Sequence, residues 1–364
     1  MATIKLYKIQ MPLLSSFTTS FDTTVYKVAL IFELTDLNIK AYSECVTDEN
    51  PYYSYEDNFT AMHIIKDHLL KLISDLPEPE TFIKRASKVK GHNMAKAAIE
   101  MLLWDYKAKK EKVPLYQMLY KSKNYADVGI SIGMDDPALM LSNVENALKA
   151  GYKRIKVKIA HGKELSILNA IRDTYPEIPL SADANADYTL SDLDLLKSLD
   201  RFNLVYLEQP LSHDDIIDHA ILKKNISTPI CLDESITSYE NAVKAFEIGA
   251  TDIINIKPGR VGGLYNSLLI AKTAREHDGH AWVGGMLETG IGRAFNIALA
   301  STDLIDYPGD TSPNSRYFSR DIVVNPFKME NGRIYPYNEH GIGIKIDNEQ
   351  LSNVTIFSEK LLEK

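Results

Sequence analysis

Short β-rich runs alternate with helical runs between residues 126 and 305, and this rhythm constrains the fold more than any other feature. The β-rich runs span residues 128–133, 154–159, 179–183, 204–208, 229–233, 252–257 and 280–283. The stretches between them carry helix signals: Asp136 and Pro137 form an N-cap and a first-turn proline, and Gly151 ends the same helix. Successive strand–helix units are typical of parallel strands joined by right-handed crossovers. Seven such units favour an α/β barrel over an open sheet.

The stretch before these units combines strands and helices in a different order. Strand-like runs at residues 4–11 and 25–34 come first, and an amphipathic helix follows with apolar residues three and four apart from Met62 to Leu76. A second helical run spans residues 94–109. Strands followed by helices favour an α+β domain, which we place at residues 1–125.

The stretch after residue 315 is short. Strand-like runs are expected there at residues 321–324 and 341–346. Because a tail of this length cannot bury a core of its own, we expect residues 316–364 to return to the N-terminal domain. The two segments together would then form a cap over one end of a barrel at residues 126–315.

Composition narrows the class of protein. Of the 364 residues, 45% are hydrophobic and 25% are charged, which is ordinary for a globular chain. The net charge of −8 argues against nucleic acid as a partner, since that binding depends on Lys and Arg neutralising phosphates. A membrane span needs about 18 consecutive apolar residues and a secretory signal needs an apolar core, and neither pattern is found. Two cysteines, Cys45 and Cys231, are too few for a disulfide framework and suit the cytoplasm.

Three acids end consecutive β-rich runs. Asp183, Glu208 and Asp233 follow one another at intervals of 25 residues, so one strand–helix unit separates each from the next. A single acid at a strand end is often a helix N-cap, but three in register would point together at the C-terminal rim of a barrel, where barrel active sites lie. Without a cation these carboxylates would repel one another. Oxygen ligands favour Mg²⁺, or Mn²⁺, over zinc as that cation.

Lysines end the strands on either side of the acids. Lys156 and Lys158 are two residues apart and share one strand face, and Lys158 precedes Asp183 by 25 residues. Lys257 ends the run after Asp233. A solvated sheet face would be an alternative location for these lysines, but barrel strands are covered on both faces. Because buried lysines are rare unless paired, a functional role is favoured.

This order of charges indicates a reaction class. A carboxylate substrate bound to the metal can lose the adjacent proton and form an enediolate, whose charge the metal stabilises as a Lewis acid. Lys158 can act as the base only if its pKa falls from about 10.4, which the metal and Lys156 would promote. A Schiff-base aldolase using Lys257 would not need three acids. A non-catalytic binding barrel would not need all five charged positions.

Several motifs surround these residues. The motifs are Glu44-Cys45-Val46-Thr47, Gly91-His92-Asn93-Met94-Ala95-Lys96, Lys156-Val157-Lys158, Asp183-Ala184-Asn185, Glu208-Gln209-Pro210, Asp233-Glu234-Ser235, Lys257-Pro258-Gly259-Arg260-Val261-Gly262-Gly263 and Gly284-Gly285-Met286-Leu287-Glu288-Thr289-Gly290-Ile291-Gly292-Arg293. Each alone is weak, but jointly they are highly specific. With them the chain resembles the muconate-lactonizing-enzyme subgroup of the enolase superfamily over essentially its whole length. Within that subgroup it is most similar to the o-succinylbenzoate synthase / N-acylamino acid racemase family.

The resemblance implies a (β/α)7β modified TIM barrel with an α+β capping domain, in a cytoplasmic homo-oligomer that acts on a small carboxylate. It implies metal ligation by Asp183, Glu208 and Asp233, and acid–base roles for Lys158 and Lys257. The implied role of Lys156 is to tune Lys158 and to contact the substrate carboxylate. A closing loop is implied at residues 17–22. The implied substrate-binding residues are Ser131, Asn185, Arg260, Gly285, Met286 and Tyr53.

The resemblance leaves the reaction open. Dehydration to o-succinylbenzoate, a step of menaquinone biosynthesis, and racemisation of N-acylamino acids such as N-succinylamino acids begin with the same proton abstraction. Arg260 matches the Lys-x-x-Arg pattern of the racemising members, and a surface salt bridge is its other interpretation. A muconate-cycloisomerase-like enzyme and a dipeptide epimerase are alternatives on the same scaffold. The epimerases carry an Asp-x-Asp pair near the last strands, which the segment from Asp303 to Asp306 lacks.

Overall fold

A parallel sheet forms the centre of the molecule. The computed structural model describes residues 2–18 and 23–363, and in them seven strands pair in the order β11-β10-β9-β8-β7-β6-β5. The strands are β5 (Gly129–Ile132), β6 (Arg154–Lys158), β7 (Leu180–Asp183), β8 (Leu207–Glu208), β9 (Ile230–Leu232), β10 (Ile253–Ile256) and β11 (His280–Val283). Each β-rich run predicted from the sequence contains one of them.

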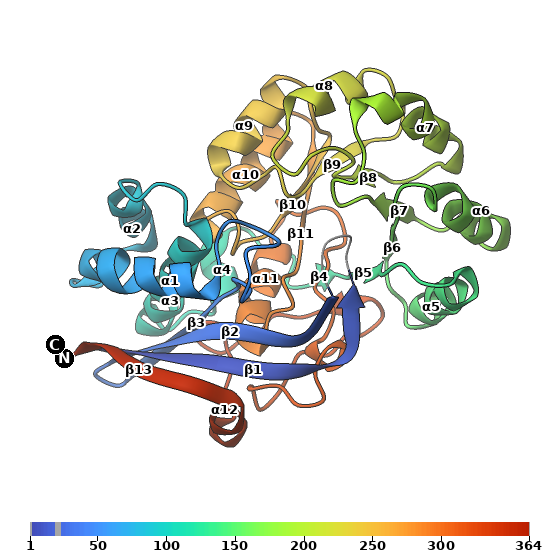
Figure 1. The fold of residues 1–364 in the computed structure, drawn as a ribbon. Coiled ribbons are helices and arrows are strands. Elements are labelled where there is room, and N and C mark those ends of the chain that lie inside the picture. The colour runs from blue at the N-terminus through green and yellow to red at the C-terminus, as the bar shows by residue number, and fades with distance from the viewer. Residues whose placement is uncertain (1, 19–22, 364) are drawn as a thin grey trace.

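Helices connect the strands and cover the outside of the sheet (Figure 1). They are α5 (Pro137–Lys149), α6 (Glu164–Thr174), α7 (Leu193–Ser198), α8 (Ile217–Lys223), α9 (Tyr239–Glu247), α10 (Leu264–Glu276) and α11 (Gly290–Ala300). Helix α5 begins as predicted, because the Asp136 side chain accepts a hydrogen bond from the Ala138 N–H at 2.9 Å. Its buried residues, such as Met140 and Val144, recur four apart and face the barrel.

An irregular segment after α11 closes the sheet. The Gly129 N–H donates to the Gly309 carbonyl at 2.8 Å, and the Asp310 N–H donates to the Val283 carbonyl at 2.9 Å. Residues 309–310 therefore bridge β5 and β11, where an eighth strand would lie. A side chain at Gly309 would place its Cβ 2.5 Å from the Val283 carbonyl oxygen, so this close approach requires glycine. The predicted (β/α)7β barrel is confirmed.

The cap combines an antiparallel sheet with helices. The sheet has the order β13-β1-β2-β3, with β1 (Thr3–Thr18), β2 (Thr23–Asp36), β3 (Ile39–Cys45) and β13 (Thr355–Glu363). Its helices are α1 (Asn58–Ile64), which continues through a π turn (Ile65–Leu69) and a 3₁₀ turn (Leu70–Ile73), then α2 (Pro79–Ala86), α3 (Asn93–Glu111) and α4 (Leu115–Leu119). Thr3 pairs with Glu363, so the two ends of the chain lie side by side (Figure 1).

The tail reaches the cap by a different route from the one predicted. The strands expected at residues 321–324 and 341–346 are wrong: those segments share only an isolated bridge between Val323 and Ile346. The apolar side chain of Val323 packs at the start of α11 instead, where a Cβ on Gly290 would meet it. The segment also holds the short strand β12 (Arg333–Ile334), which pairs with β4 (Ala126–Asp127), and helix α12 (Asn348–Val354).

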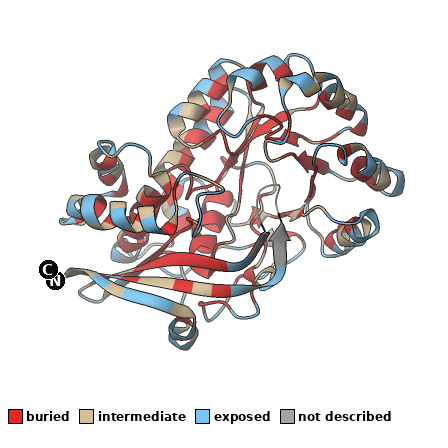
Figure 2. Cartoon of the chain, in the orientation of Figure 1, coloured by how far each residue is buried: buried red, intermediate tan, exposed pale blue. Residues whose placement is uncertain are grey.

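Buried apolar residues form two large cores and one small cluster of Tyr206, Cys231, Ile253 and Trp282. One core lies between the barrel strands and their helices, and another lies between the cap sheet and the cap helices (Figure 2). Among the described residues, no helix has the length and apolar character needed to span a membrane.

Two buried glutamates of the cap bind the starts of the last two barrel helices. Glu44 of β3 accepts hydrogen bonds from Thr289 N–H at 3.0 Å and from Gly292 N–H at 3.1 Å, at the start of α11. Glu100 of α3 accepts from the N–H groups of Leu264 and Tyr265 at 2.9 and 2.8 Å, at the start of α10. The first N–H groups of a helix have no partner inside the helix, and they favour an anion. The cap is thus attached to the β10–β11 side of the rim.

Glu100 makes the stability of this attachment depend on pH. Burial raises the pKa of Glu100 to about 7, despite the hydrogen bonds from Tyr265 and Leu264. A carboxyl whose pKa is raised on folding stabilises the fold below its unfolded pKa, and that contribution is lost as the pH rises through about 7. The free energy of unfolding of wild type, measured relative to that of Glu100→Gln, should therefore fall by about 2 kcal/mol between about pH 5 and pH 8. Thermal unfolding of both proteins across this range measures the difference, and a constant difference would contradict the expectation.

Candidate active site

A cavity of about 400 Å³ lies between the C-terminal ends of the barrel strands and the cap. The cap contributes β2 and the segment at residues 48–53 to its wall. Of the predicted closing loop at 17–22, residues 19–22 lie outside the described residues. Glu208 and Arg260 lie behind the wall and bond to residues in it. The other predicted site residues all line the cavity: Tyr53, Ser131, Lys156, Lys158, Asp183, Asn185, Asp233, Lys257, Gly285 and Met286.

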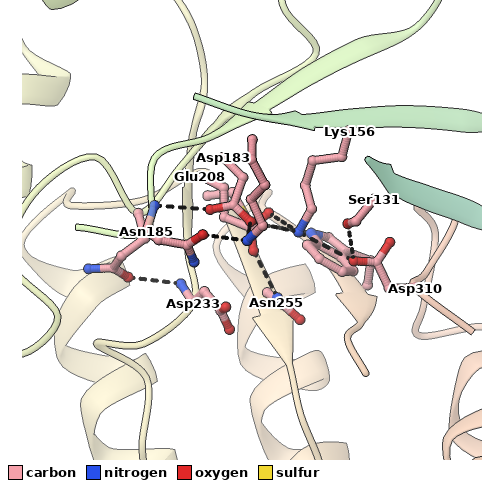
Figure 3. Close-up of polar contacts among 12 residues, drawn as sticks. Ser131, Lys156, Asp183, Asn185, Glu208, Asp233, Asn255 and Asp310 are labelled. Atoms are coloured by element: carbon pink, nitrogen blue, oxygen red, sulfur yellow. Dashed lines mark hydrogen bonds and ion pairs between the residues drawn. The ribbon is translucent and has the colours of Figure 1, made fainter. Parts of the chain in front are cut away.

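Strand register aligns the charged residues at the rim. Lys158 is the partner of Asp183 across β6 and β7, and Asp183 is the partner of Glu208 across β7 and β8. Glu208 pairs in turn with Cys231, which sets Asp233 two residues beyond that row. Because parallel neighbours keep their side chains on the same face, these acids converge (Figure 3).

Lys156 lies within the acidic cluster. Its Nζ is 2.7 Å from Glu208 Oε2 and 3.0 Å from Asp183 Oδ2. It also lies 4.7 Å from the centre of the Trp282 ring, a distance that suits a cation–π contact. Burial opposes the charge on Lys156, but the nearby carboxylates outweigh that cost and hold its pKa well above the usual range. Lys156 is thus a permanent cation in the floor of the cavity.

The three acids differ in their affinity for protons. Burial opposes ionisation of Asp183, but Lys156 and Lys158 outweigh it and lower the pKa of Asp183. Arg260 and Lys257 likewise outweigh burial at Asp233 and hold its pKa well below the usual range. For Glu208, burial and the charge of Asp183 dominate and raise its pKa to about 8. Glu208 is therefore the acid of the cluster that ionises least readily.

The donor set fits a hard divalent cation. Among the described residues, Glu234 Oε2 and Asn255 Oδ1 are buried and accept no hydrogen bond, although both side chains line the cavity. Surplus buried oxygens beside repelling carboxylates are the ligands that Mg²⁺ takes. The acids are instead bridged by ammonium groups, since Lys156 bonds to both Glu208 and Asp183. Within the described part of the chain, no three acidic, histidine or cysteine side chains already surround one point.

The two outer lysines bind different acids. Lys158 Nζ donates to Asp183 Oδ2 at 2.7 Å and to Asn185 Oδ1. Lys257 Nζ donates to Asp233 Oδ2 at 2.9 Å and to the Tyr53 hydroxyl at 3.0 Å. Burial opposes the charge on Lys257, but Asp233 and Tyr53 outweigh that cost and raise its pKa.

Arg260 is buried, so the surface salt bridge considered for it is wrong. The Arg260 side chain is 3% exposed. Its Nη1 donates to Asp233 Oδ1 and, at 2.9 Å, to the Tyr53 hydroxyl. Its Nη2 donates to the Asn255 carbonyl at 2.7 Å. Arg260 and Lys257 therefore share the carboxylate of Asp233, one on each oxygen.

Asp310 was not identified from the sequence. Its carboxylate accepts a hydrogen bond from Ser131 Oγ at 2.8 Å, and it pairs with Arg154 at 2.7 Å and with Lys156 at 3.3 Å. Burial opposes its ionisation, but Lys156 and Arg154 outweigh that effect and hold the pKa of Asp310 well below the usual range. The sequence predicts the last-strand position of an acid pair at residues 303–306. The structure places that strand position at residues 309–310 instead.

Asn255 is another site residue that sequence reasoning missed. Its Nδ2 donates to Glu208 Oε1 at 2.9 Å. One signal could have found it, because Asn255 and Lys257 repeat the two-residue spacing of Lys156 and Lys158. Residues that are two apart on a strand carry their side chains on the same face, so both pairs project into the barrel.

Comparison with known proteins identifies the family of this chain. Residues 2–119 match the mandelate racemase / muconate lactonizing enzyme N-terminal domain, and residues 139–351 match the enolase C-terminal domain-like family. The chain belongs to the enolase superfamily. The resemblance stated from its motifs is thereby confirmed.

Individual relatives of this enolase-superfamily member are similar over nearly their whole length. The o-succinylbenzoate synthase of Geobacillus stearothermophilus is 42% identical over 96% of this chain and 95% of its own. The N-succinylamino acid racemase of Thermus thermophilus is 38% identical over 96% of this chain and 95% of its own. A solved enolase-superfamily member from Listeria innocua has a TM-score of 0.96 at 38% identity, covering 99% of this chain and 98% of its own. The protein is thus an enzyme of the family that contains these synthases and racemases.

Proposed function

We propose that this enzyme removes the proton next to the carboxylate of a small substrate, acting as an o-succinylbenzoate synthase. The observation that carries the proposal is the placement of Lys158 and Lys257. They bind Asp183 and Asp233 respectively, at opposite edges of one acidic cluster within one cavity. Racemisation of N-succinylamino acids is the second activity proposed for the same site, and the contact of Arg260 with Asp233 favours it.

The chain's own residues have distinct tasks in this proposal. A Mg²⁺ ion held by Asp183, Glu208 and Asp233 would supply Lewis-acid stabilisation of the charge that develops on the substrate. Lys156, a permanent cation, faces the substrate carboxylate. The remaining predicted pocket residues, Ser131, Asn185, Gly285, Met286 and Tyr53, hold and enclose the substrate.

Proton transfer is assigned to the two outer lysines. Neutral Lys158 takes the α-proton and becomes an ammonium. In dehydration, the same ammonium returns the proton to the departing hydroxide as water forms, while Lys257 stays charged and stabilises the developing negative charge. In racemisation, Lys257 delivers its own proton to the opposite face of the α-carbon, and Lys158 keeps the one it took. The two reactions therefore differ in whether Lys257 must change its protonation state.

The proposal also covers the setting of the enzyme. We place it in the cytoplasm, in menaquinone biosynthesis, as a homo-oligomer. The names of the relatives support the o-succinylbenzoate synthase reaction on which this placement depends. The free thiols of Cys45 and Cys231 are compatible with a reducing compartment.

Dipeptide epimerisation receives less support from the geometry. An ammonium-binding acid pair at the last strand position would comprise Asp310 and the residue two further on, which is Ser312. The carboxylate of Asp310 is already neutralised by Arg154 and Lys156. A dipeptide amino group would find no uncompensated carboxylate at Asp310.

A side-by-side assay tests the proposed function. The cyclohexadiene carboxylate precursor of o-succinylbenzoate, an N-succinylamino acid and an alanyl-glutamate dipeptide are each incubated with the enzyme and Mg²⁺. We expect turnover of the first substrate and racemisation of the second. Turnover of the dipeptide alone would reject the proposal in favour of an epimerase.

Arg260→Gln is expected to separate the two activities. In wild type Arg260 binds one oxygen of Asp233 and Lys257 the other. Without Arg260 the whole charge of Asp233 acts on Lys257 and raises its pKa further, so the proton is released less readily. A shift of one pKa unit changes the acid dissociation constant of Lys257 about tenfold. The loss in kcat/KM should therefore be about tenfold greater for racemisation than for dehydration. Equal losses in both reactions would show that Arg260 is structural.

A further inference from the structure

One side chain of the cap reaches a lysine of the barrel rim. The Tyr53 hydroxyl accepts hydrogen bonds from Lys257 Nζ at 3.0 Å and from Arg260 Nη1 at 2.9 Å. The same ammonium lies 4.9 Å from the centre of the Tyr53 ring. Lys257 is therefore held by one barrel carboxylate, Asp233, and by one phenol from the cap.

The corresponding lysine across the cavity is held differently. Lys158 Nζ donates to Asp183 and Asn185, and both of these residues belong to the barrel. Among residues 2–18 and 23–363, the cap thus contacts the two lysines unequally. Any effect of the cap on the position of an ammonium group falls first on Lys257.

The cap segment that carries Tyr53 is fixed at its start against the loop that carries Lys257. Val46, which precedes this segment, packs on Gly259, and an alanine Cβ at 259 would lie 2.4 Å from Val46 Cγ2. Glycine at 259 is therefore needed for the cap to come this close. On the cap side, Glu56 accepts hydrogen bonds from the N–H groups at the start of α3.

A second contact fixes α3 itself to the barrel. Asn93 Nδ2 at the start of α3 donates to the Thr237 carbonyl at 2.6 Å, in the loop that follows Asp233. The segment between Val46 and α3 is thus attached at both ends, and Tyr53 lies between these attachments.

From these contacts we propose that Tyr53 is a positioning residue for Lys257 and not for Lys158. The cap then controls one of the two faces on which the substrate exchanges a proton. This inference rests on the proposed two-lysine function. It predicts that loss of the Tyr53 hydroxyl impairs proton transfer on the Lys257 face and spares the Lys158 face.

Enantiomer-resolved exchange tests the inference. The α-proton of each enantiomer of N-succinylphenylalanine is exchanged in D₂O at saturating substrate, and Lys158→Ala and Lys257→Ala identify which enantiomer depends on which lysine. In Tyr53→Phe, exchange of the Lys257-dependent enantiomer should fall about tenfold and that of the other less than about twofold. A general structural defect would lower both. Tyr55→Phe, in the same cap segment, is the matched control and should keep the wild-type ratio.

A second set of variants tests the close approach of the cap. Gly259→Ala should shift the exchange ratio in the same direction as Tyr53→Phe, because its Cβ displaces Val46. Adding Val46→Ala removes the clashing methyl groups, leaves the Val46 Cβ 3.5 Å away, and should restore the ratio. An unchanged ratio in Gly259→Ala would overturn the positional argument.

The outcomes separate this inference from the function on which it rests. If the two lysine variants show no enantiomer preference, the two-lysine function fails and this inference fails with it. If they do show the preference but Tyr53→Phe lowers exchange of both enantiomers equally, or of neither, only the role of Tyr53 is rejected.

Discussion

Asp183→Asn, Glu208→Gln and Asp233→Asn should each fold and lose at least about a thousandfold in kcat/KM for the proposed reactions. Lewis-acid stabilisation contributes several kcal/mol, and each 1.4 kcal/mol is about tenfold in rate. An amide keeps the shape of the carboxylate but carries no charge to hold the cation. Calorimetric titration with Mn²⁺ should show weakened metal binding in each variant, independently of any assay.

The variants should differ in stability in a defined order. Asp183 and Asp233 each pair with buried cations, so an amide leaves those cations uncompensated, which is strongly destabilising. Glu208 also pairs with a buried cation, Lys156, but burial and Asp183 raise its pKa to about 8, so less of its charge is lost on substitution and Glu208→Gln should unfold closest to wild type. Glu100→Gln removes a buried carboxylate that makes no contact with the three acids and serves as the control that keeps metal binding. Full activity in any cluster variant, or after exhaustive chelation, would reject the metal assignment.

The barrel could be predicted because its strand ends carry a sharp sequence signal. Lys158, Asp183 and Glu208 are the last residues of β6, β7 and β8. An apolar run that stops at a charged residue marks the point where a covered strand reaches the rim. The 25-residue spacing then indicated that the charges meet, because each unit of one strand and one helix advances the chain by one position around the barrel.

The rest of the site depends on contacts that local sequence does not encode. Residues 309–310 complete the barrel only through hydrogen bonds to β5 and β11, and a two-residue segment has no periodicity to recognise. Asp310 was missed for that reason. The burial of Arg260 follows from its contact with Asp233, 27 residues earlier, and the bond from Lys257 to Tyr53 spans 204 residues. Strand β13 was missed because it is an edge strand whose Ile356 and Phe357 are exposed, so it lacks the alternation of a half-buried strand.

Lys158→Ala and Lys257→Ala should each abolish racemisation while leaving exchange on one face. Racemisation needs one lysine to take a proton and the other to deliver one, so the loss of either stops inversion. The remaining lysine can still remove and return a proton on its own face. Each variant should therefore exchange the α-proton of one enantiomer in D₂O, and the two variants should prefer opposite enantiomers.

Dehydration provides the second readout of the same pair. If Lys158 takes the proton and returns it to the departing hydroxide, the rate of dehydration should fall in Lys158→Ala by a factor of about 10² to 10⁴, which is what a general base contributes. Lys257→Ala should lose less, because Lys257 serves there only as a charge, and Lys257→Arg should recover part of that loss while still failing to racemise. Mass spectrometry of deuterium uptake and chiral chromatography of the recovered substrate separate exchange from inversion. Equal exchange of both enantiomers in both alanine variants would exclude a base on each face, since one lysine alone would then reach the α-carbon from both sides.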